Sequence, residues 1–255
     1  MTNTAHLSIG VAGSLGPERI ARIAGAVESA GFHALWVNDT PGGDSLAALA
    51  AAAEVTDRLV LATGVLPVDR RPAAQIAAEA ASLPQDRLVL GIGSGGTRSG
   101  ILAVMRAAVA DLRRDTGARI VLGALGPKMR HLAATDADGP LLSWLTPEVA
   151  AAQASEARTA NADVRVSLYV RAALDDAAVP RLDEETARYA SYPNYAANFA
   201  RLDIAARATV IAPTDAADRL GAYRRAVDEV VLRAITAGDD DADYLRFVDR
   251  ASALL

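Results

Sequence analysis

Short runs rich in valine, isoleucine and leucine alternate with longer alanine-rich, amphipathic segments along the whole chain. Runs that are apolar throughout, rather than at every second position, are typical of parallel strands buried on both faces. The pattern predicts strands at residues 7–13, 34–39, 59–66, 87–93, 118–126, 139–145, 163–174 and 227–235. It predicts helices between them at residues 17–30, 44–55, 72–83, 98–115, 127–135, 147–160, 181–203 and 240–253.

Eight strand–helix units in a chain of 255 residues are typical of an α/β protein with a (β/α)8 barrel, also called a TIM barrel. Residues 208–213 also have strand character, and we interpret them as a connection to a helix that begins near Asp215. No linker or low-complexity segment divides the chain, so we expect one domain over residues 1–255.

The composition limits the kinds of binding site that the chain can form. The chain has no cysteine, which excludes disulfides and thiolate metal sites. Its three histidines, His6, His33 and His131, have no metal-ligand spacing, so we expect no metal site. The net charge is −5 and no lysine- or arginine-rich run is present, which argues against a nucleic-acid partner.

The first residues do not combine a basic start with an apolar segment, so we expect no signal peptide and a cytoplasmic protein. No apolar stretch of about 18 residues lacks charges or helix breakers, so we also expect no membrane partner.

A glycine-rich motif follows the fourth predicted strand. Gly91, Gly93 and Gly96 have the G-x-G-x-x-G spacing of a dinucleotide-binding loop. That loop belongs in the first strand–helix turn of a Rossmann domain, whereas three units precede it here. In a barrel the loop lies at the carboxyl ends of the strands, where its backbone N–H groups and the hydroxyls of Ser94 and Thr97 can bind an anion. A tight turn that requires positive φ is the alternative.

Other strand ends carry further candidates. The stretch GALGPKM (123–129) offers a second anion site beside Lys128, although a plain turn fits it equally well. Asp39 ends the second strand, as a site residue or as a cap of the next helix. Trp144 either lines a pocket or fills the core, and tyrosines 189, 192 and 195 either cover the barrel mouth or pack between helices.

Several stretches, in this order, resemble the bacterial luciferase-like superfamily of flavin- and deazaflavin-dependent oxidoreductases. The resemblance covers nearly the whole chain and is carried by residues 28–39, 46–66, 70–83, 87–96, 121–147, 192–202 and 219–233. It implies a luciferase-like (β/α)8 barrel that binds FMN or the deazaflavin coenzyme F420 at its mouth. GALGPKM looks more like the F420-dependent members.

The resemblance also implies site residues. In F420-dependent members the third strand commonly has a bulge with a non-prolyl cis peptide, which maps to Gly64 and Val65. Asp39 matches an acidic position near the deazaflavin ring and is the predicted catalytic residue. The implied cofactor-binding residues are Asp39, Gly64, Val65, Gly93, Ser94, Gly95, Gly96, Thr97, Ala124, Leu125, Gly126, Pro127 and Lys128.

The expected function is therefore hydride transfer between F420 and a small organic substrate, in a homodimer as is common among such proteins. The alternatives are an FMN-dependent luciferase-like monooxygenase and a non-catalytic cofactor-binding relative. Two departures favour the last of these. Thr40 stands where some F420-dependent members have a histidine, and the insertion that often follows the fourth strand is shortened.

Overall fold

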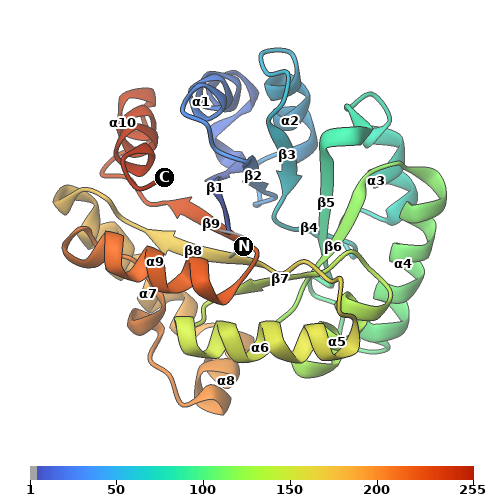
Figure 1. Cartoon of the computed structure of the whole chain (residues 1–255). Coiled ribbons are helices and arrows are strands. Elements are labelled where there is room, and N and C mark those ends of the chain that lie inside the picture. The colour runs from blue at the N-terminus through green and yellow to red at the C-terminus, as the bar shows by residue number, and fades with distance from the viewer. Residues whose placement is uncertain (1–4) are drawn as a thin grey trace.

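The strands form one closed, all-parallel sheet in the computed structural model, which describes residues 5–255 (Figure 1). They are β1 (His6–Ala12), β2 (Ala34–Asn38), β3 (Val60–Thr63), β4 (Leu66–Pro67), β5 (Leu88–Gly93), β6 (Arg119–Gly123), β7 (Pro140–Ser143), β8 (Ser167–Ala172) and β9 (Glu229–Ala234). Their order is β3-β2-β1-β9-β8-β7-β6-β5-β4, and a β3–β5 pairing closes the ring. Because β3 and β4 are two parts of one predicted strand, the predicted (β/α)8 barrel is confirmed.

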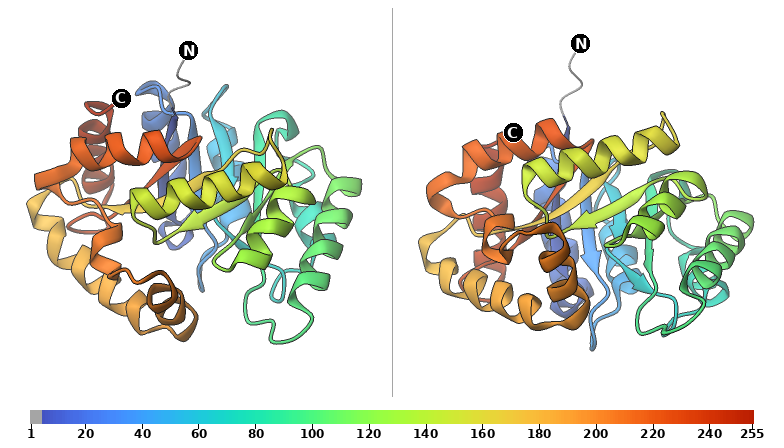
Figure 2. Two further views of the ribbon diagram at one scale, coloured as in Figure 1. Left: turned by 60° about the horizontal axis from the view of Figure 1, so that its bottom comes forward. Right: turned by 90° about the horizontal axis from the view of Figure 1, so that it is seen from below.

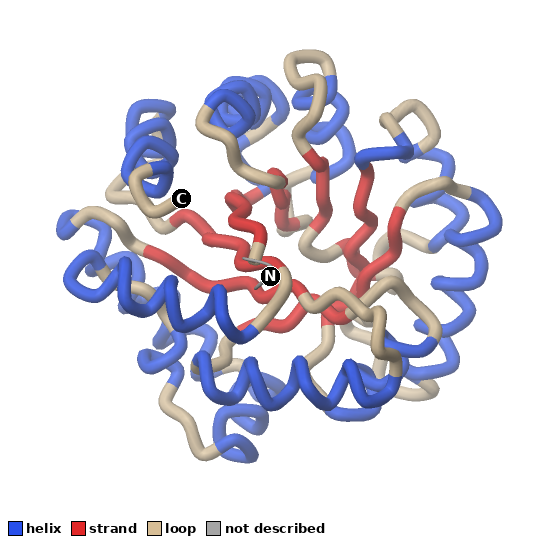
Figure 3. The backbone as a smooth tube through the Cα atoms, viewed as in Figure 1, coloured by secondary structure: helices blue, strands red, loops and turns tan. Residues whose placement is uncertain are grey.

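Helices surround this barrel on all sides (Figure 3). They are α1 (Pro17–Ser29), α2 (Ser45–Ala53), α3 (Ala73–Ala80), α4 (Ile101–Asp115), α5 (Pro127–Thr135), α6 (Pro147–Ala160), α7 (Val179–Ser191), α8 (Pro193–Leu202), α9 (Ala216–Ala226) and α10 (Asp241–Ser252). Capping side chains fix the N-termini of several helices. The side chains of Asp44, Thr146 and Asp240 accept hydrogen bonds from backbone N–H groups at the starts of α2, α6 and α10.

The helix predicted at residues 181–203 is two helices, α7 and α8. Tyr192 has an extended backbone, with φ −74° and ψ 127°, and Pro193 then begins α8. A proline disfavours helical geometry in the residue before it, which explains the break. Figure 2 shows that α8 lies at the end of the barrel opposite the start of β1.

Residues 208–213 form a connection, as predicted, with a single bridge to the barrel. Ile211 pairs with Ala172 in parallel, through its N–H to the carbonyl of Arg171 at 2.9 Å. The following helix, α9, begins one residue after Asp215.

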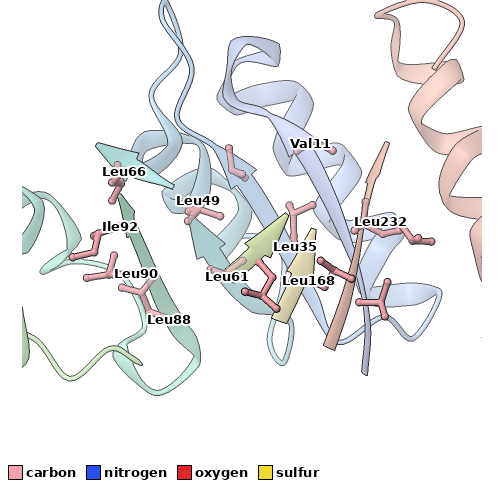
Figure 4. Packing of buried hydrophobic residues seen from close by; sticks show 14 of the residues in the cluster. Val11, Leu35, Leu49, Leu61, Leu66, Leu88, Leu90, Ile92, Leu168 and Leu232 are labelled. Atoms are coloured by element: carbon pink, nitrogen blue, oxygen red, sulfur yellow. The ribbon is translucent and has the colours of Figure 1, made fainter. Parts of the chain in front are cut away.

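Side chains form two apolar layers because successive residues of a strand point to opposite faces. The outer layer packs the strands against the helices, and Figure 4 shows part of it, including Leu35, Leu61 and Leu168. The inner layer fills the barrel with Ala34, Trp36, Ala62, Val89, Val121, Leu141, Tyr169 and Val231. None of the helices in residues 5–255 has the length and apolarity needed to cross a membrane.

Candidate active site at the barrel mouth

A cavity of about 310 Å³ opens at the carboxyl ends of the strands, and we call it the glycine cavity. Its lining includes part of the predicted cofactor site: Gly64, Val65, Gly93, Ser94, Gly95, Ala124 and Leu125. The remaining lining residues are Pro67, Gly123, Leu141, Ser143, Tyr169, Arg171, Asn194 and Tyr195. In a (β/α)8 barrel this face carries the active site.

The bulge between β3 and β4 contains a cis peptide bond between Gly64 and Val65, as the resemblance implied. The Asn38 side chain donates a hydrogen bond to the Gly64 carbonyl. A Cβ atom at Gly93 would lie 2.7 Å from Val65 Cγ2, so that glycine makes room for the bulge. At Gly64 a Cβ would lie 3.1 Å from the Tyr169 ring. The bulge therefore packs closely against its neighbouring strands.

The glycine-rich loop already holds a carboxylate. The Gly96 N–H donates to Asp69 Oδ2 at 2.8 Å, and a Cβ at Gly95, where φ is +56°, would overlap Asp69 Oδ1. Its backbone can thus bind an oxyanion, and the side chain that does so here is exposed. The helix predicted at residues 98–115 begins three residues later than expected, because Gly100 adopts φ +63° and α4 begins at Ile101.

The residues that follow β6 lie at two different places on the surface. Ala124 and Leu125 line the glycine cavity, whereas Pro127 and Lys128 are exposed and line a separate hollow between α4 and α5. Gly126 is the N-cap residue of α5. The structure therefore does not bring Lys128 to the cavity, because α5 carries it past the rim.

Asp39 lies beside the mouth but does not line the glycine cavity. Its carboxylate is 5% exposed and is 3.3 Å from Arg70 Nη2 and 3.8 Å from Arg71 Nη2. It also accepts a hydrogen bond from Ser45 Oγ at 3.0 Å. These contacts fix the start of α2, while Asp44 supplies the helix cap.

Arg171 is a candidate site residue that the sequence analysis missed. It is 6% exposed, on the inward face of β8, and lines the glycine cavity. Its Nη1 donates to Ser143 Oγ at 2.6 Å, and its guanidinium lies 4.1 Å from the centre of the Trp144 ring. The signal in the sequence that could have revealed this residue was a single arginine within the otherwise apolar run SLYVRA.

Trp144 and the three tyrosines support this arginine. Trp144 is 1% exposed, so it fills the core behind Arg171 rather than lining the cavity. Tyr189 lies 4.7 Å from the guanidinium, and its ring is 5.0 Å from that of Tyr195 and 5.4 Å from that of Tyr192. Tyr195 lines the cavity, and burial raises the pKa of its hydroxyl. The tyrosine cluster thus both packs α7 against α8 and borders the mouth.

A second cavity, of about 410 Å³, opens between the ends of β1 and β9 and α7. We call it the arginine cavity, after Arg19, Arg181, Arg188 and Arg233 in its lining. Glu185 also lines it and is 3.2 Å from Arg171 Nε, so the Arg171–Glu185 ion pair lies between the two cavities. Across residues 5–255 no three histidine, aspartate or glutamate side chains gather in a way that could hold a metal ion.

Comparison with known proteins finds similarity in sequence over part of the chain and similarity in fold over nearly all of it. A model of the luciferase-like monooxygenase family matches residues 1–102. The match covers the first 102 of the 255 residues, so this part of the chain is similar in sequence to that family. By sequence, no protein of curated function matches the chain.

Several solved structures share the (β/α)8 barrel fold over nearly the whole length of this chain. A coenzyme F420-dependent tetrahydromethanopterin reductase from Methanopyrus kandleri has a TM-score of 0.76 and 14% identity, over 99% of this chain and 98% of that one. An F420-dependent secondary alcohol dehydrogenase, in complex with an F420–acetone adduct, has a TM-score of 0.75 and 16% identity, over 98% and 99%. A monooxygenase from Streptomyces bottropensis has a TM-score of 0.72 and 18% identity, over 98% of each chain.

Proposed function

We propose that the protein is an oxidoreductase that transfers a hydride between coenzyme F420 and a small organic substrate. The observation that carries the proposal is the Gly64–Val65 bulge, which borders a cavity rimmed by the loops after β5 and β6. The stretch GALGPKM (123–129), which resembles F420-dependent members, supports F420 over FMN. Two structures of the same fold are also described as F420-dependent.

The glycine cavity suits a deazaflavin ring. Its volume of about 310 Å³ falls within the range of small-molecule sites, and Val65, Leu141 and Tyr195 give it apolar surface. When bound, the cofactor supplies the hydride chemistry. Val65 would support the ring, and the charge of Arg171 would favour the electron-rich reduced form. Tyr195 would limit the access of water.

The tail phosphate of the cofactor has a candidate site in the glycine-rich loop. The Gly96 N–H and the hydroxyls of Ser94 and Thr97 are suitable donors, and Asp69 must first leave the Gly96 N–H. A catalytic role for Asp39 stays a prediction, and its contacts with Arg70 and Ser45 favour a structural one.

Two alternatives have their own support. An FMN-dependent monooxygenase is favoured by the solved monooxygenases that share the fold, because the same cavity suits a flavin ring. A non-catalytic relative is favoured by Thr40 and by the short connection between β5 and α4, residues 94–100. We further propose a homodimer, as the resemblance implies, and a cytoplasmic location. Sedimentation equilibrium and cell fractionation would test them.

Fluorescence titration of the purified protein with F420 and with FMN tests the proposal. Binding of F420 at micromolar concentration, and weaker binding of FMN, is the expected result. The reverse order would select the monooxygenase. Absence of binding for both at high concentration would exclude cofactor-dependent catalysis.

A matched pair of glycine variants tests the loop. Gly95→Ala should weaken cofactor binding, because a side chain at φ +56° strains the loop and shifts the backbone N–H groups that would bind the phosphate. Gly31→Ala is the control, since Gly31 also has a positive φ, of +88°, but has open space around it and lies outside the mouth. Equal affinity in the two variants would remove the loop from the cofactor site.

A further inference from the structure

The end of the barrel interior carries more positive than negative charge. Arg171 and Arg233 are register partners on the adjacent parallel strands β8 and β9, so their side chains leave the sheet on the same face. Glu185 of α7 lies 3.2 Å from Arg171 Nε and 3.4 Å from Arg188 Nη2. Burial alone would raise the pKa of Glu185, but Arg233 and Arg171 outweigh it and hold that pKa below its ordinary value. Glu185 thus contacts two guanidinium groups directly, and the charge of Arg233 acts on it from beyond 4 Å.

Arg233 is the arginine that this arrangement leaves without a partner. Within residues 5–255 no carboxylate lies within 4 Å of its guanidinium, and its side chain donates only to the carbonyl of Ala234. The other arginines of the cavity are paired with carboxylates: Arg19 with Asp241 at 2.7 Å, Arg181 with Asp239 at 2.8 Å, and Arg188 with Glu185 at 3.4 Å. Arg233 is half-buried, so water compensates its charge only in part.

A second unsatisfied group lines the same cavity. Thr40 Oγ1 is buried and has no hydrogen-bond partner within the described part of the chain. A buried hydroxyl without a partner costs about 1–3 kcal/mol, which a ligand that accepts its hydrogen bond would recover. Thr40 follows β2 and Arg233 is the penultimate residue of β9, so the two donors reach the cavity from either side of β1.

We propose that the arginine cavity binds a small organic carboxylate, with Arg233 as the counter-ion and Thr40 as a second donor. The volume of about 410 Å³ admits a small molecule. A monoanion fits better than a phosphate dianion, because Glu184, Glu185 and Asp239 also line the cavity and leave a small positive surplus around Arg233. The Arg171–Glu185 pair lies between this cavity and the glycine cavity, so the carboxylate would anchor the hydride-transfer substrate, and a separate carbonyl or alcohol carbon of the same molecule would exchange the hydride with the cofactor. This last step rests on the proposed function.

Calorimetric titration of the cofactor-free protein with butyrate and with butyramide tests the site. The two probes have similar size and shape and differ in charge. Butyrate should bind at millimolar concentration, at least tenfold more tightly than butyramide. Equal affinity, or no heat from butyrate up to 100 mM, would overturn the proposal.

Variants then assign the binding to Arg233. Arg233→Met should weaken butyrate binding at least tenfold and Thr40→Val severalfold, while Arg233→Lys should retain part of the affinity. Arg225→Met is the matched control, because Arg225 is exposed in the last turn of α9 and lines neither cavity. Wild-type affinity in a folded Arg233→Met protein would also overturn the proposal, and Arg233→Lys keeps the test valid if Arg233→Met does not fold.

The two proposals fail separately. If butyrate binds and neither F420 nor FMN does, the carboxylate site stands and the hydride-transfer function falls. If a cofactor binds and butyrate does not, the oxidoreductase assignment stands and its substrate is not a carboxylate bound at Arg233.

Discussion

The two ends of the barrel interior differ in how their buried charges are compensated, and β9 contributes one charged residue to each end. At the start of β9, Glu229 is 5% exposed and accepts hydrogen bonds from Ser8 Oγ at 2.7 Å, Trp36 Nε1 at 2.7 Å and Ser167 Oγ at 2.8 Å. At the end of the same strand, Arg233 has no carboxylate partner in the described chain. The first charge is fully satisfied by neutral donors, and the second is not.

This difference distinguishes a charge that stabilises the fold from a charge that is available to bind a ligand. A buried carboxylate with three donors needs no ligand, and its partners come from β1, β2 and β8, so it ties four strands together. A partly compensated arginine beside a cavity costs stability until an anion arrives. The arrangement agrees with the general division of (β/α)8 barrels into a stabilising face at the strand starts and an active face at the strand ends.

The largest expected effect is at the strand starts. Glu229→Leu leaves three buried donors without an acceptor and should lower the free energy of unfolding by about 3 kcal/mol or more. Glu229→Gln keeps an accepting oxygen and should cost roughly 1 kcal/mol. Urea unfolding measures both. A loss below 1 kcal/mol for the leucine variant would show that the network contributes little.

At the strand ends we expect affinity, rather than stability, to change. Asp69→Asn removes a charge that competes for the Gly96 N–H, so cofactor affinity should rise roughly three- to tenfold, the equivalent of one hydrogen bond. Asp86→Asn is the control, because it changes the net charge equally at an exposed position away from the mouth. Unchanged or weaker binding by Asp69→Asn would show that Asp69 does not compete with the cofactor.

Arg233→Met gives the sharpest contrast with Glu229→Leu. Removing one of two neighbouring positive charges relieves their repulsion, so the free energy of unfolding should change by less than about 1 kcal/mol in either direction. The same urea experiment measures it. A loss as large as that of Glu229→Leu would mean that Arg233 is structural.

A further effect concerns pH, again at the strand starts. His33 stacks on His6 at 4.0 Å, and burial is the main cause that lowers the pKa of His33 from 6.5 to about 4. The unfolded chain therefore binds a proton below pH 6.5 that the folded protein binds only near pH 4, and stability falls as the pH drops through this range. His33→Gln should flatten this decline in urea midpoints measured between pH 7 and 4.5. The exposed His131→Gln should follow wild type, and a wild-type slope in His33→Gln would contradict the assignment.

Much of the fold was predictable because its signals are local. Fully apolar runs marked the strands, and each predicted strand range overlaps an observed strand. The break at Tyr192–Pro193 was also a local signal, but the helical pattern on both sides concealed it. The start of α4 was misjudged because the positive φ of Gly100 depends on the path of the whole loop.

The site was less predictable because its contacts join residues far apart in the chain. The bulge at Gly64–Val65 came from family resemblance, and the geometry agrees. Lys128 looked suitable beside the loop after β6, yet α5 carries it to another surface. Asp69 reaches a loop 27 residues later, and no local pattern reveals that contact.

Alternating apolar runs and amphipathic segments were sufficient to specify the barrel, because the burial of strands and helix faces depends on short-range periodicity. The same pattern placed the glycine-rich loop at the mouth. The balance of charge there came only from folding: strand register set Arg171 beside Arg233, and α7 placed Glu185 against Arg171 but not within 4 Å of Arg233. Sheet closure likewise gathered three donors around Glu229. Whether a buried charge is satisfied depends on its neighbours in space, which spacing along the chain does not encode.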